Sequence, residues 1–503
     1  LESPRYGDAN HVVAERVPPG LILDPGRDEP LHRQLYDRLR ESVLTGMLPP
    51  GTRLASTRAM ASELGVSRNT VMAAFNQLLA EGYLQGRVGS GTYVTRTLPD
   101  DVLRARAARP ERETVERGRG LSRRGSKLVA TPVSVARVGA PVAFRPGLPA
   151  LDEFPLELWS RLVARRWRNA TPDLLGYGDP AGHRALRQAI AGHLAVARSV
   201  RCDPDQVVIV SGSQQALDLA SRLLLDPGDK VWVEDPGYLG ARAVVTGAGA
   251  EIVPVPVDPE GLVVSAGVAR APKAAMAYVT PSHQYPLGVT MSLARRLELL
   301  EWARKAGAWV LEDDYDSETR YAGRPLAALQ GLDADQRVIY MGTFSKVMLP
   351  SLRLGYLVLP PDVVDAFVAA RAVSDRHSPS VEQAALADFI DEGHFDRHIR
   401  RMRMLYADRQ AALLHAAHRH LDGMLEVRAH DAGKHVVGLL PEGADDAALS
   451  ERARVHRVEA QPLSAYYLRE QPKQGFVLGY AAVPERSTRA AVLRLAEALR
   501  EGG

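Results

Sequence analysis

From Val142 to the end of the chain, short runs of apolar, β-forming residues alternate with stretches of helical periodicity. The clearest of these runs are VVIVSG, KVWVEDP, AMAYVTP, AWVLEDD, RVIYMGTFS and YLVLP. Strands that alternate with helices in this way form a mostly parallel sheet with helices packed on its faces. The sequence therefore predicts an α/β domain over residues 142–503.

The residues before this region have a different texture, and a chain of 503 residues is too long for one hydrophobic core. Residues 1–97 are predicted to hold an irregular lead-in and a small domain whose core spans residues 31–97. Residues 98–141 include RARAARPERETVERGRGLSRRGSK, which has almost no large apolar residues. Such a segment cannot bury a core, so a flexible basic linker is predicted there.

Charge is distributed unevenly between the two ends of the chain. Residues 1–140 carry 21 Lys and Arg against 15 Asp and Glu, a balance of +6, whereas the rest carries 42 against 45, a balance of −3. A basic N-terminal part on a mildly acidic body suggests that the N-terminal part meets a polyanion. An Arg-rich composition alone gives the same count, so this interpretation needs a motif to support it.

The sequence predicts neither secretion nor a membrane span. No stretch approaches the roughly 18 consecutive apolar residues that a membrane helix needs, and LESPRYGDAN does not resemble a signal peptide. Cys202 is the single cysteine, which excludes an internal disulfide and fits a reducing compartment. We therefore expect a cytoplasmic protein without membrane contact.

The segment after residue 30 has the pattern of a small DNA-binding module. Leucine and valine recur at four-residue steps over residues 31–45, which predicts a helix that ends near Gly46. ASTRAMASELGVSRNTVMAAFNQLLAEGYL then predicts two helices that meet at Gly65 and are capped by Ser56 and Ser67. Two short helices joined by a glycine-containing turn are typical of a helix-turn-helix. GYLQGRVGSGTYV follows and predicts two short strands that form a wing.

The start of the third predicted helix is the part expected to enter DNA. In a helix-turn-helix the N-terminal residues of the second helix of the motif face the major groove. Here they are Ser67, Arg68, Asn69 and Thr70, which can all contact phosphates or base edges. The alternative is a three-helix packing module with no nucleic-acid role. The predicted buried face consists of Val71, Phe75, Leu78 and Leu79.

Lys346, one of only seven lysines, follows the predicted strand RVIYMG in the segment YMGTFSKVMLPSLRLGY. A lysine on a loop after a strand can form a Schiff base, while neighbouring hydroxyls and a guanidinium hold a cofactor phosphate. Thr343, Ser345 and Arg353 supply these groups. A serine next to a lysine is common on protein surfaces, so the hypothesis depends on residues further upstream.

Three upstream segments supply the groups that a pyridine cofactor needs. AWVLEDDYDSE ends a strand with Asp313, which can face the protonated ring nitrogen, and with Tyr315, which can reach the ring oxygen. VVIVSGSQQALDLASRLL leads through Ser213 and Gln214 into a helix whose N-terminal N–H groups favour a phosphate. KVWVEDPGYLG places Tyr238 after the next strand, where its ring can stack on the cofactor.

The segment PPGTRLASTRAMASELGVSRNTVMAAFNQLLAEGYLQGRVGSGTYV resembles the winged helix-turn-helix of the GntR family of bacterial DNA-binding regulators. The resemblance implies that double-stranded operator DNA is a partner. It also implies a set of DNA-contacting residues, with Arg58, Arg68 and Thr70 in contact and Ser67, Asn69 and the wing glycines, Gly89 among them, in support.

The C-terminal region resembles the fold-type I aminotransferases, because several motifs follow that family's order. They are LLGYGDPAGHRALRQAIAGHL, SGSQQAL, VEDPGY, TPSHQYPLG, EDDYDSE and GTFSKVMLPSLRLGY. The resemblance implies pyridoxal 5'-phosphate (PLP) as cofactor, with Lys346 as the aldimine lysine, Asp313 on the ring nitrogen, Tyr315 on the ring oxygen and Tyr238 stacked on the ring. It assigns the phosphate to Ser213, Gln214, Thr343, Ser345 and Arg353.

Tyr177, in LLGYGDPAG, matches a position that reaches the phosphate of a neighbouring subunit, which implies a homodimer. Two departures from the enzymes concern the substrate side. Residues 285–288 read YPLG where the enzymes have N-P-T-G, so the amide on the ring oxygen is missing and His283 is the candidate to replace it. FVLGYAAV offers no arginine to bind a substrate carboxylate in bidentate fashion.

The whole arrangement resembles the MocR subfamily of GntR regulators, which implies head-to-tail homodimers and a sensor in place of an enzyme. We expect that PLP modulates operator binding and that the regulated genes serve PLP synthesis. Two alternatives stay open at this point. One is a sensor of an amine or amino acid, such as aminobutyrate or taurine, and the other is an active aminotransferase with a DNA-binding appendage. No metal site is predicted.

Overall fold

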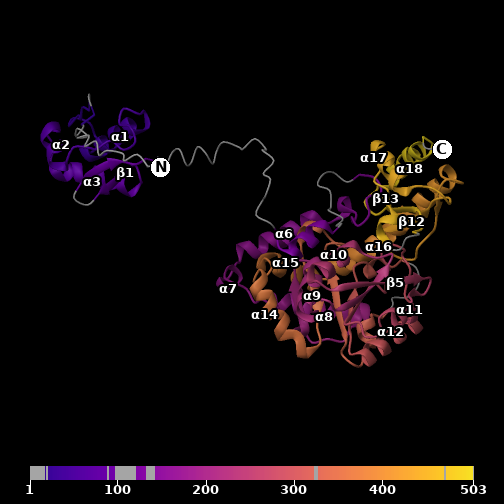
Figure 1. Cartoon of the computed structure of the whole chain (residues 1–503). Helices are drawn as coiled ribbons and strands as arrows, with labels where there is room; N and C mark the ends of the chain where they lie inside the picture. The colour runs from indigo at the N-terminus through magenta and orange to yellow at the C-terminus, as the bar shows by residue number, and fades with distance from the viewer. Residues whose placement is uncertain are drawn as a thin grey trace, which may run out of the picture. The chain divides into compact units, whose positions relative to one another are not determined.

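The computed structural model describes residues 17–18, 21–87, 90–96, 121–131, 142–321, 327–468 and 472–501. The chain divides into two compact units, residues 1–120 and 121–503. Figure 1 shows the smaller unit in indigo and the larger unit in colours from magenta to yellow. Each unit is described by itself below.

The described part of the smaller unit has three helices followed by a two-stranded antiparallel ribbon, in the order that the sequence predicts. Its elements are α1 (Leu31–Leu44), α2 (Thr57–Leu64), α3 (Arg68–Ala80), β1 (Leu84–Arg87) and β2 (Gly91–Val94). Ser56 accepts a hydrogen bond from the N–H of Ala59, and Ser67 accepts one from the N–H of Thr70. Gly65 ends α2 with φ 65°, a left-handed conformation that glycine adopts at little cost.

One hydrophobic core holds the three helices of this unit together. Leu35 and Leu39 of α1 pack against Val71, Phe75 and Leu78 of α3. Leu79, which the sequence also places on the buried face, lies at the edge of this core and is half-buried. The apolar face of α3 therefore points inward, and its polar N-terminal turn stays exposed.

The larger unit is built on an eight-stranded sheet with the order β3-β10-β9-β8-β7-β4-β5-β6. The strands β9, β8, β7, β4 and β5 are parallel, β10 runs antiparallel to β3 and β9, and β6 runs antiparallel to β5. Their bounds are β3 Val207–Val210, β4 Lys230–Asp235, β5 Glu251–Asp258, β6 Gly261–Leu262, β7 Met276–Val279, β8 Trp309–Asp313, β9 Val338–Thr343 and β10 Gly355–Val358. The prediction of a mostly parallel sheet is confirmed.

Helices cover both faces of this sheet because its strands are apolar on both sides. One face packs against α6 (Leu156–Arg168), α8 (Arg184–Arg198), α11 (Val264–Arg270), α12 (Leu293–Ala306) and α15 (Ser380–Asp391). The other face packs against α9 (Ser213–Leu224), α10 (Leu239–Ala248) and α14 (Val364–Ser374). Ile209 of β3 points to the face covered by the first group of helices, and its neighbours Val208 and Val210 point to the face covered by α9, α10 and α14.

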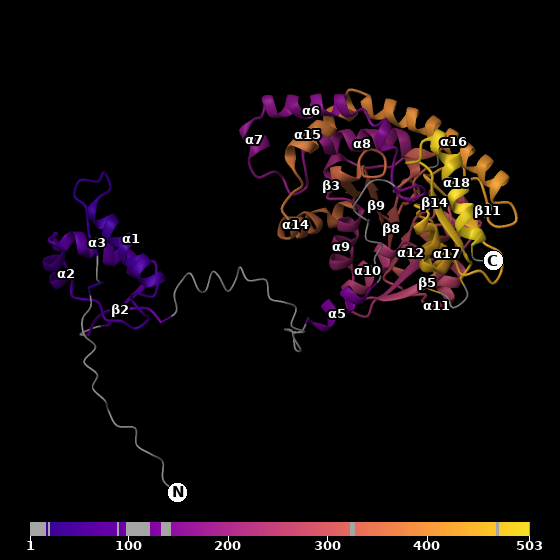
Figure 2. The ribbon, with the colours of Figure 1, turned by 90° about the horizontal axis from the view of Figure 1, so that it is seen from above.

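The C-terminal elements form a second layer around a four-stranded antiparallel sheet with the order β11-β12-β14-β13. The strands are β11 Glu426–Val427, β12 His435–Leu439, β13 Gln461–Pro462 and β14 Gly475–Gly479, and the helices are α16 His394–His420, α17 Asp446–Val455 and α18 Glu485–Arg500. Figure 2 shows α16 alongside α18, and the two helices share one core cluster with β12 and β14. Over the described residues, no helix combines the length and apolar character needed to cross a membrane.

Part of the segment predicted as a flexible linker, residues 98–141, is helical. Helix α5 (Arg123–Ala130) is capped by Ser122, which accepts a hydrogen bond from the N–H of Gly125 at 3.0 Å. It contacts α10, where the Leu128 side chain lies against Gly247 and the Arg124 guanidinium donates to the carbonyl of Gly247. The cap and this one apolar contact explain why residues 121–131 differ from the expectation.

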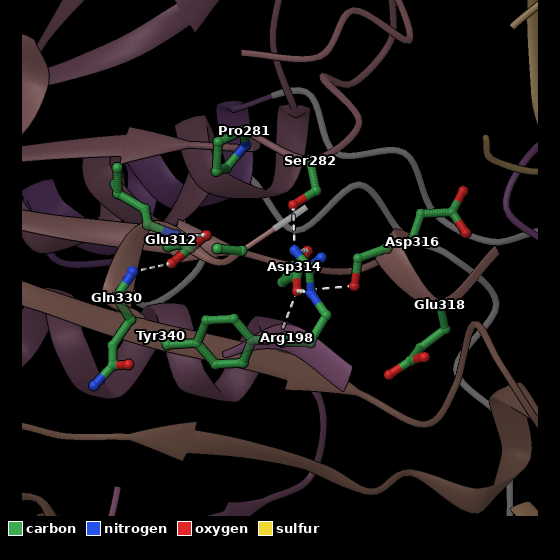
Figure 3. A network of polar contacts seen from close by, with 12 residues as sticks. Arg198, Pro281, Ser282, Glu312, Asp314, Asp316, Glu318, Gln330 and Tyr340 are labelled. Carbon is green, nitrogen blue, oxygen red and sulfur yellow. Dashed lines mark hydrogen bonds and ion pairs between the residues drawn. The ribbon is translucent and has the colours of Figure 1, made fainter. Parts of the chain in front are cut away.

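A buried polar network connects α8 to residues at and after the central strands (Figure 3). Arg198 Nε lies 2.8 Å from Asp314 Oδ2, and Arg198 Nη2 donates to Ser282 Oγ at 2.6 Å. The hydroxyl of Tyr340 donates to the same carboxylate at 2.5 Å. Arg198 beside Asp314 lowers the pKa of that carboxyl although burial alone raises it. Asp314 is therefore held ionised inside the protein.

Removal of the arginine should destabilise the larger unit strongly. We expect Arg198→Ala to lower its free energy of unfolding by about 3–5 kcal/mol, because the substitution leaves a buried carboxylate without its counter-ion. Urea unfolding followed by circular dichroism measures the change. The matched control is Arg304→Ala, which removes an exposed arginine paired with Glu301 at 2.8 Å. Equal effects of the two substitutions would contradict the role given to the buried pair.

Candidate cofactor site

One cavity of about 380 Å³ lies where the parallel strands end. The carboxyl ends of parallel strands share one edge of a sheet, so side chains that follow different strands meet there. The structure brings nine of the residues predicted from the sequence to this cavity, namely Ser213, Gln214, Tyr238, Asp313, Tyr315, Thr343, Ser345, Lys346 and Arg353. These residues come from separate segments of the chain, and the prediction connected them through their positions at strand and helix ends and through the order of the motifs.

Lys346 is the nucleophile that the cavity offers. It follows β9, and its Nζ donates a hydrogen bond to the carbonyl of Gly147 at 3.0 Å. Burial lowers the pKa of the Lys346 ammonium, although the nearby Asp313 carboxyl acts in the opposite direction. A lower pKa increases the fraction of neutral amine, which is the form that attacks a carbonyl carbon.

Asp313 ends β8, and among the described residues only one of its two carboxyl oxygens has a hydrogen-bond partner. Tyr278 donates its hydroxyl to Asp313 Oδ2 at 2.7 Å. Oδ1 is buried and has no hydrogen-bond partner among the described residues. Burial raises the pKa of Asp313 to about 7. A buried carboxyl oxygen without a partner fits a ligand that brings its own N–H, such as a protonated pyridine ring.

The residues predicted to hold a phosphate lie at the start of α9 and in the loop after β9. Gly212 precedes Ser213 with φ 108°, a conformation that favours glycine, and Arg353 lies next to it across the cavity. The Ser345 hydroxyl is buried and lacks a hydrogen-bond partner among the described residues. A helix N-terminus, a hydroxyl and a guanidinium together fit a phosphate dianion.

The two tyrosines predicted to hold a cofactor ring both line the cavity. Tyr238 caps the start of α10, and burial raises the pKa of its hydroxyl to about 12. Tyr315 lines the same cavity, and burial raises the pKa of its hydroxyl well above the usual value. Both therefore stay neutral at physiological pH, and each keeps its hydroxyl proton.

His283 was predicted to replace the missing amide on the cofactor ring, but it is not among the residues that line the cavity. Its side chain is buried, and its Nδ1 lies 3.0 Å from the Tyr315 hydroxyl. The residue sits behind Tyr315 because the backbone at Gly433 leaves space there that a Cβ would fill. Any effect of His283 on a ring oxygen therefore passes through Tyr315.

The predictions for Tyr177 and Gly89 are not tested by the structure. Tyr177 is 84% exposed, with the Arg376 guanidinium 4.7 Å from the centre of its ring, and it does not line the cavity of its own chain. An exposed aromatic ring is compatible with a contact to a second copy of the chain, which stays a prediction. Gly89 lies outside the described residues, so its predicted contact with DNA also stays a prediction.

Of the residues predicted to contact DNA, those that the structure describes lie at the start of α3, except Arg58, which lies in the first turn of α2. Arg58, Ser67, Arg68 and Asn69 are exposed, and Thr70 is half-buried. Ser67 Oγ lies 2.9 Å from Thr70 Oγ1, and Arg68 Nε lies 3.4 Å from Thr57 Oγ1. These contacts hold the helix start in a fixed shape while leaving the Arg68 side chain exposed for a partner.

Several residues that line the cavity were given no role from the sequence, and of these only Tyr285 belongs to a recognised motif, TPSHQYPLG. They are Arg145, Tyr278, Tyr285, Lys434, His435, Glu459, Gln461 and Tyr466. Tyr278 belongs to the buried run AMAYVTP and looks like a core residue in the sequence. Lys434 and Glu459 come from β-rich segments of the C-terminal layer, where no spacing rule connects them to Lys346.

Two family descriptions match the chain. "Bacterial regulatory proteins, gntR family" matches residues 31–94, and "Aminotransferase class I and II" matches residues 151–454. The probable rhizopine catabolism regulatory protein MocR of Rhizobium meliloti is 45% identical over 482 residues, which cover 95% of each chain. The chain belongs to the MocR-type regulators of the GntR family.

Other relatives show which parts are shared with regulators and which with enzymes. The HTH-type pyridoxine biosynthesis transcriptional regulator PdxR of Corynebacterium glutamicum is 31% identical over 96% of this chain and 99% of its own length. The crystal structure of the kynurenine aminotransferase of Pyrococcus horikoshii in complex with PMP has 31% identity and a TM-score of 0.67 over 72% of this chain and 91% of its own. The MocR-type chain therefore has a fold-type I aminotransferase domain, and this fold implies a cofactor of the pyridoxal phosphate group.

Proposed function

We propose that this MocR-type protein is a transcription regulator whose affinity for operator DNA depends on PLP held at Lys346. The observation that carries the proposal is the meeting of Lys346, the unpaired Asp313 oxygen and the unpaired Ser345 hydroxyl in one cavity. The GntR-type domain of the same chain supplies the DNA-binding function. Its relatives of similar length are regulators, which supports a role without turnover.

Each group in the cavity has a part in this proposal. Lys346 would hold the cofactor at its aldehyde group, and Asp313 would face the ring nitrogen and favour its protonated form. Tyr238 and Tyr315 hold the ring, and Ser213, Ser345 and Arg353 hold the phosphate. When bound, PLP supplies an electron-withdrawing ring and a visible absorbance. Since binding is coupled between sites, operator DNA must change PLP affinity by the same factor as PLP changes DNA affinity.

The signal has two candidates. The first is PLP itself, with PLP-synthesis genes as the target, and it is supported by the 31% identity to PdxR and by the lack of an arginine in FVLGYAAV. The second is an amino compound that binds beside PLP. It is supported by the size of the cavity, which extends beyond the cofactor groups to residues such as Tyr285 and Gln461. A different function, that of an aminotransferase with steady turnover, is disfavoured by the same missing arginine.

A homodimer is part of the proposal. Large apolar side chains are exposed at the N-terminal edge of the larger unit, among them Leu156, Trp167, Leu175 and Tyr177. A second copy that covers them would bring the Tyr177 ring to the partner's cavity. Analytical ultracentrifugation of the wild type and of Tyr177→Ala, together with PLP affinity, tests both the assembly and the tyrosine's role.

The proposed function is tested on DNA. Full-length protein should be yellow, and its affinity for a fragment from its own upstream region should change by a factor of about 5 to 150 on addition of PLP, the range of typical allosteric couplings. Fluorescence anisotropy of labelled DNA measures the affinity, and an absorbance spectrum measures occupancy. A colourless protein, or a yellow protein with the same DNA affinity in both states, would contradict the proposal.

Asp313→Asn tests the ring-nitrogen contact. The amide can accept a hydrogen bond but carries no charge, so the substitution removes a charge-assisted hydrogen bond of about 1.5–3 kcal/mol. We expect PLP affinity to fall at least roughly tenfold in an absorbance titration. The control is Asp365→Asn, which removes an exposed carboxylate on α14. Unchanged affinity in Asp313→Asn would show that the unpaired oxygen has a different partner.

A further inference from the structure

A second part of the cavity consists of residues to which the proposed function gives no role in holding the cofactor. It is lined by Arg145, Tyr285, Lys434, Glu459, Gln461 and Tyr466. Four of these residues come from the C-terminal layer and two from the larger unit's N-terminal and central segments. This second part, called the effector subsite below, is where a compound that reacts at Lys346 would place the rest of its structure.

The cations of the effector subsite are already neutralised by carboxylates of the same chain. Arg145 Nε lies 2.6 Å from Glu459 Oε2, and both side chains are largely buried. Lys434 forms an ion pair with Asp316, and both are fully buried. A carboxylate from a ligand would have to displace one of these internal partners, which would then be left buried and unpaired at a cost of several kcal/mol.

The strand that carries the carboxylate-binding arginine in the enzymes is apolar here. Val477 of β14 is completely buried and belongs to a hydrophobic cluster with Val437, Leu463 and Tyr466. The Tyr466 ring packs edge-on against Tyr285, with ring centres 5.3 Å apart. Tyrosine rings therefore line the cavity next to β14. Arg145, whose backbone lies beside Gly479 of this strand, has its guanidinium already paired with Glu459.

The effector subsite presents hydroxyl and amide groups to a ligand. The hydroxyls of Tyr285 and Tyr466 lie 3.0 Å apart, and Tyr466 also donates to Gln461 Oε1. Such groups donate and accept at the same time, so they suit a ligand hydroxyl, which has the same dual character. The subsite is thus neutral overall, hydrogen-bonding and partly apolar.

We infer that the effector subsite takes a primary amine that carries hydroxyl groups and no carboxylate. This inference rests on the proposed function, since the amine must meet PLP at Lys346. The incoming amine takes the place of Lys346 Nζ on the cofactor's aldehyde carbon. One C–N bond forms as another breaks, a proton passes from the amine to the lysine, and no electrons are gained or lost. Lys346 is released, and its contact with the Gly147 carbonyl is free to change.

Matched ligand pairs test the inference on full-length, PLP-loaded protein. Ethanolamine and L-serine differ only by the carboxylate, and ethanolamine and propylamine differ only by exchange of hydroxyl for methyl. We expect the absorbance spectrum and the operator affinity to respond to ethanolamine at a concentration at least roughly tenfold lower than to serine, since a tenfold ratio needs only about 1.4 kcal/mol. Propylamine should give the same response only at a higher concentration than ethanolamine.

Tyr466→Phe removes the hydroxyl at the centre of the subsite and should bring the ethanolamine response to the level of propylamine. Tyr406→Phe is the control, because Tyr406 is a buried tyrosine of α16 whose hydroxyl bonds the N–H of Ala150 and does not line the cavity. A colourless wild-type protein would overturn the proposed function itself. A yellow protein that responds to serine as readily as to ethanolamine, or to neither, would overturn only the amine inference.

Discussion

Replacement of Lys346 by alanine is expected to abolish both the yellow colour and the response of DNA binding to PLP. The lysine lies at the centre of the cavity, within 3.0 Å of the Gly147 carbonyl, and no other lysine is placed next to Asp313 in the described part of the chain. Loss of the covalent bond leaves PLP with only its ring and phosphate contacts. The ratio of operator affinities with and without PLP should therefore fall to about 1, from a range of roughly 5 to 150.

The measurement combines an absorbance spectrum with fluorescence anisotropy of operator DNA. Lys305→Ala serves as the control, because Lys305 is an exposed lysine of α12 that pairs with Glu301 at 3.0 Å. The DNA affinity of the PLP-free protein should be the same in both variants and the wild type. A yellow Lys346→Ala protein would point to Lys434, the other lysine of the cavity.

Lys434 is expected to fail as a substitute even though burial lowers its pKa to about 7. Its ion pair with the buried Asp316 stabilises the protonated ammonium, which is not a nucleophile. The two buried lysines thus differ in their partners: Lys346 donates to a neutral carbonyl, while Lys434 faces a carboxylate. Lys434→Met is accordingly expected to retain the colour, which an absorbance spectrum would show directly.

The fold was predictable because local signals and the global architecture agree in this chain. Ser56, Gly65 and Ser67 mark helix boundaries through short-range hydrogen bonds and a left-handed backbone, so their positions follow from the sequence. The parallel sheet follows from the alternation of buried runs with amphipathic helices. Helix α5 was missed because its stability depends on Leu128 and Arg124 meeting α10, a contact more than a hundred residues away in the sequence.

The site was predictable only where it follows strand ends. Asp313, Thr343 and Ser213 each lie at a strand or helix terminus, and parallel topology then brings them to one edge. Tyr278, in contrast, reaches Asp313 from the middle of the neighbouring strand β7, and its hydroxyl cannot be told from that of a core tyrosine by sequence. His283 belongs to a recognised motif, but its side chain lies behind Tyr315 and does not line the cavity, so its role at the cofactor ring stays a prediction.

The effector subsite shows why charge cannot be interpreted from sequence without partners. Arg145 and Lys434 suggest a cationic pocket when they are counted alone. Arg145 is neutralised by Glu459, which lies 314 residues later in the chain. Lys434 is neutralised by Asp316, which lies 118 residues earlier. The absence of an arginine on β14 therefore acquires its meaning only when the two internal ion pairs are known.

In the smaller unit, Arg68→Ala is the substitution expected to cause the largest loss of operator affinity. Arg68 begins α3 and is exposed, and the hydrogen bond of its side chain found among the described residues is a long 3.4 Å contact to Thr57. Its removal should therefore leave the fold of the smaller unit intact. An arginine at the start of a recognition helix can bond a guanine edge or a phosphate. We expect operator affinity to fall roughly tenfold to a hundredfold, which corresponds to about 1–3 kcal/mol.

The PLP spectrum of Arg68→Ala should match that of the wild type, because all cavity residues belong to the larger unit. Arg304→Ala carries the same loss of charge at an exposed site of α12 and should bind DNA like the wild type. Anisotropy titrations with operator and with unrelated DNA separate two modes of contact. Base readout lowers affinity for the operator alone, whereas a phosphate contact lowers both affinities alike and reduces the salt dependence by about one counter-ion. Unchanged affinity for both DNAs would show that α3 is not the recognition helix.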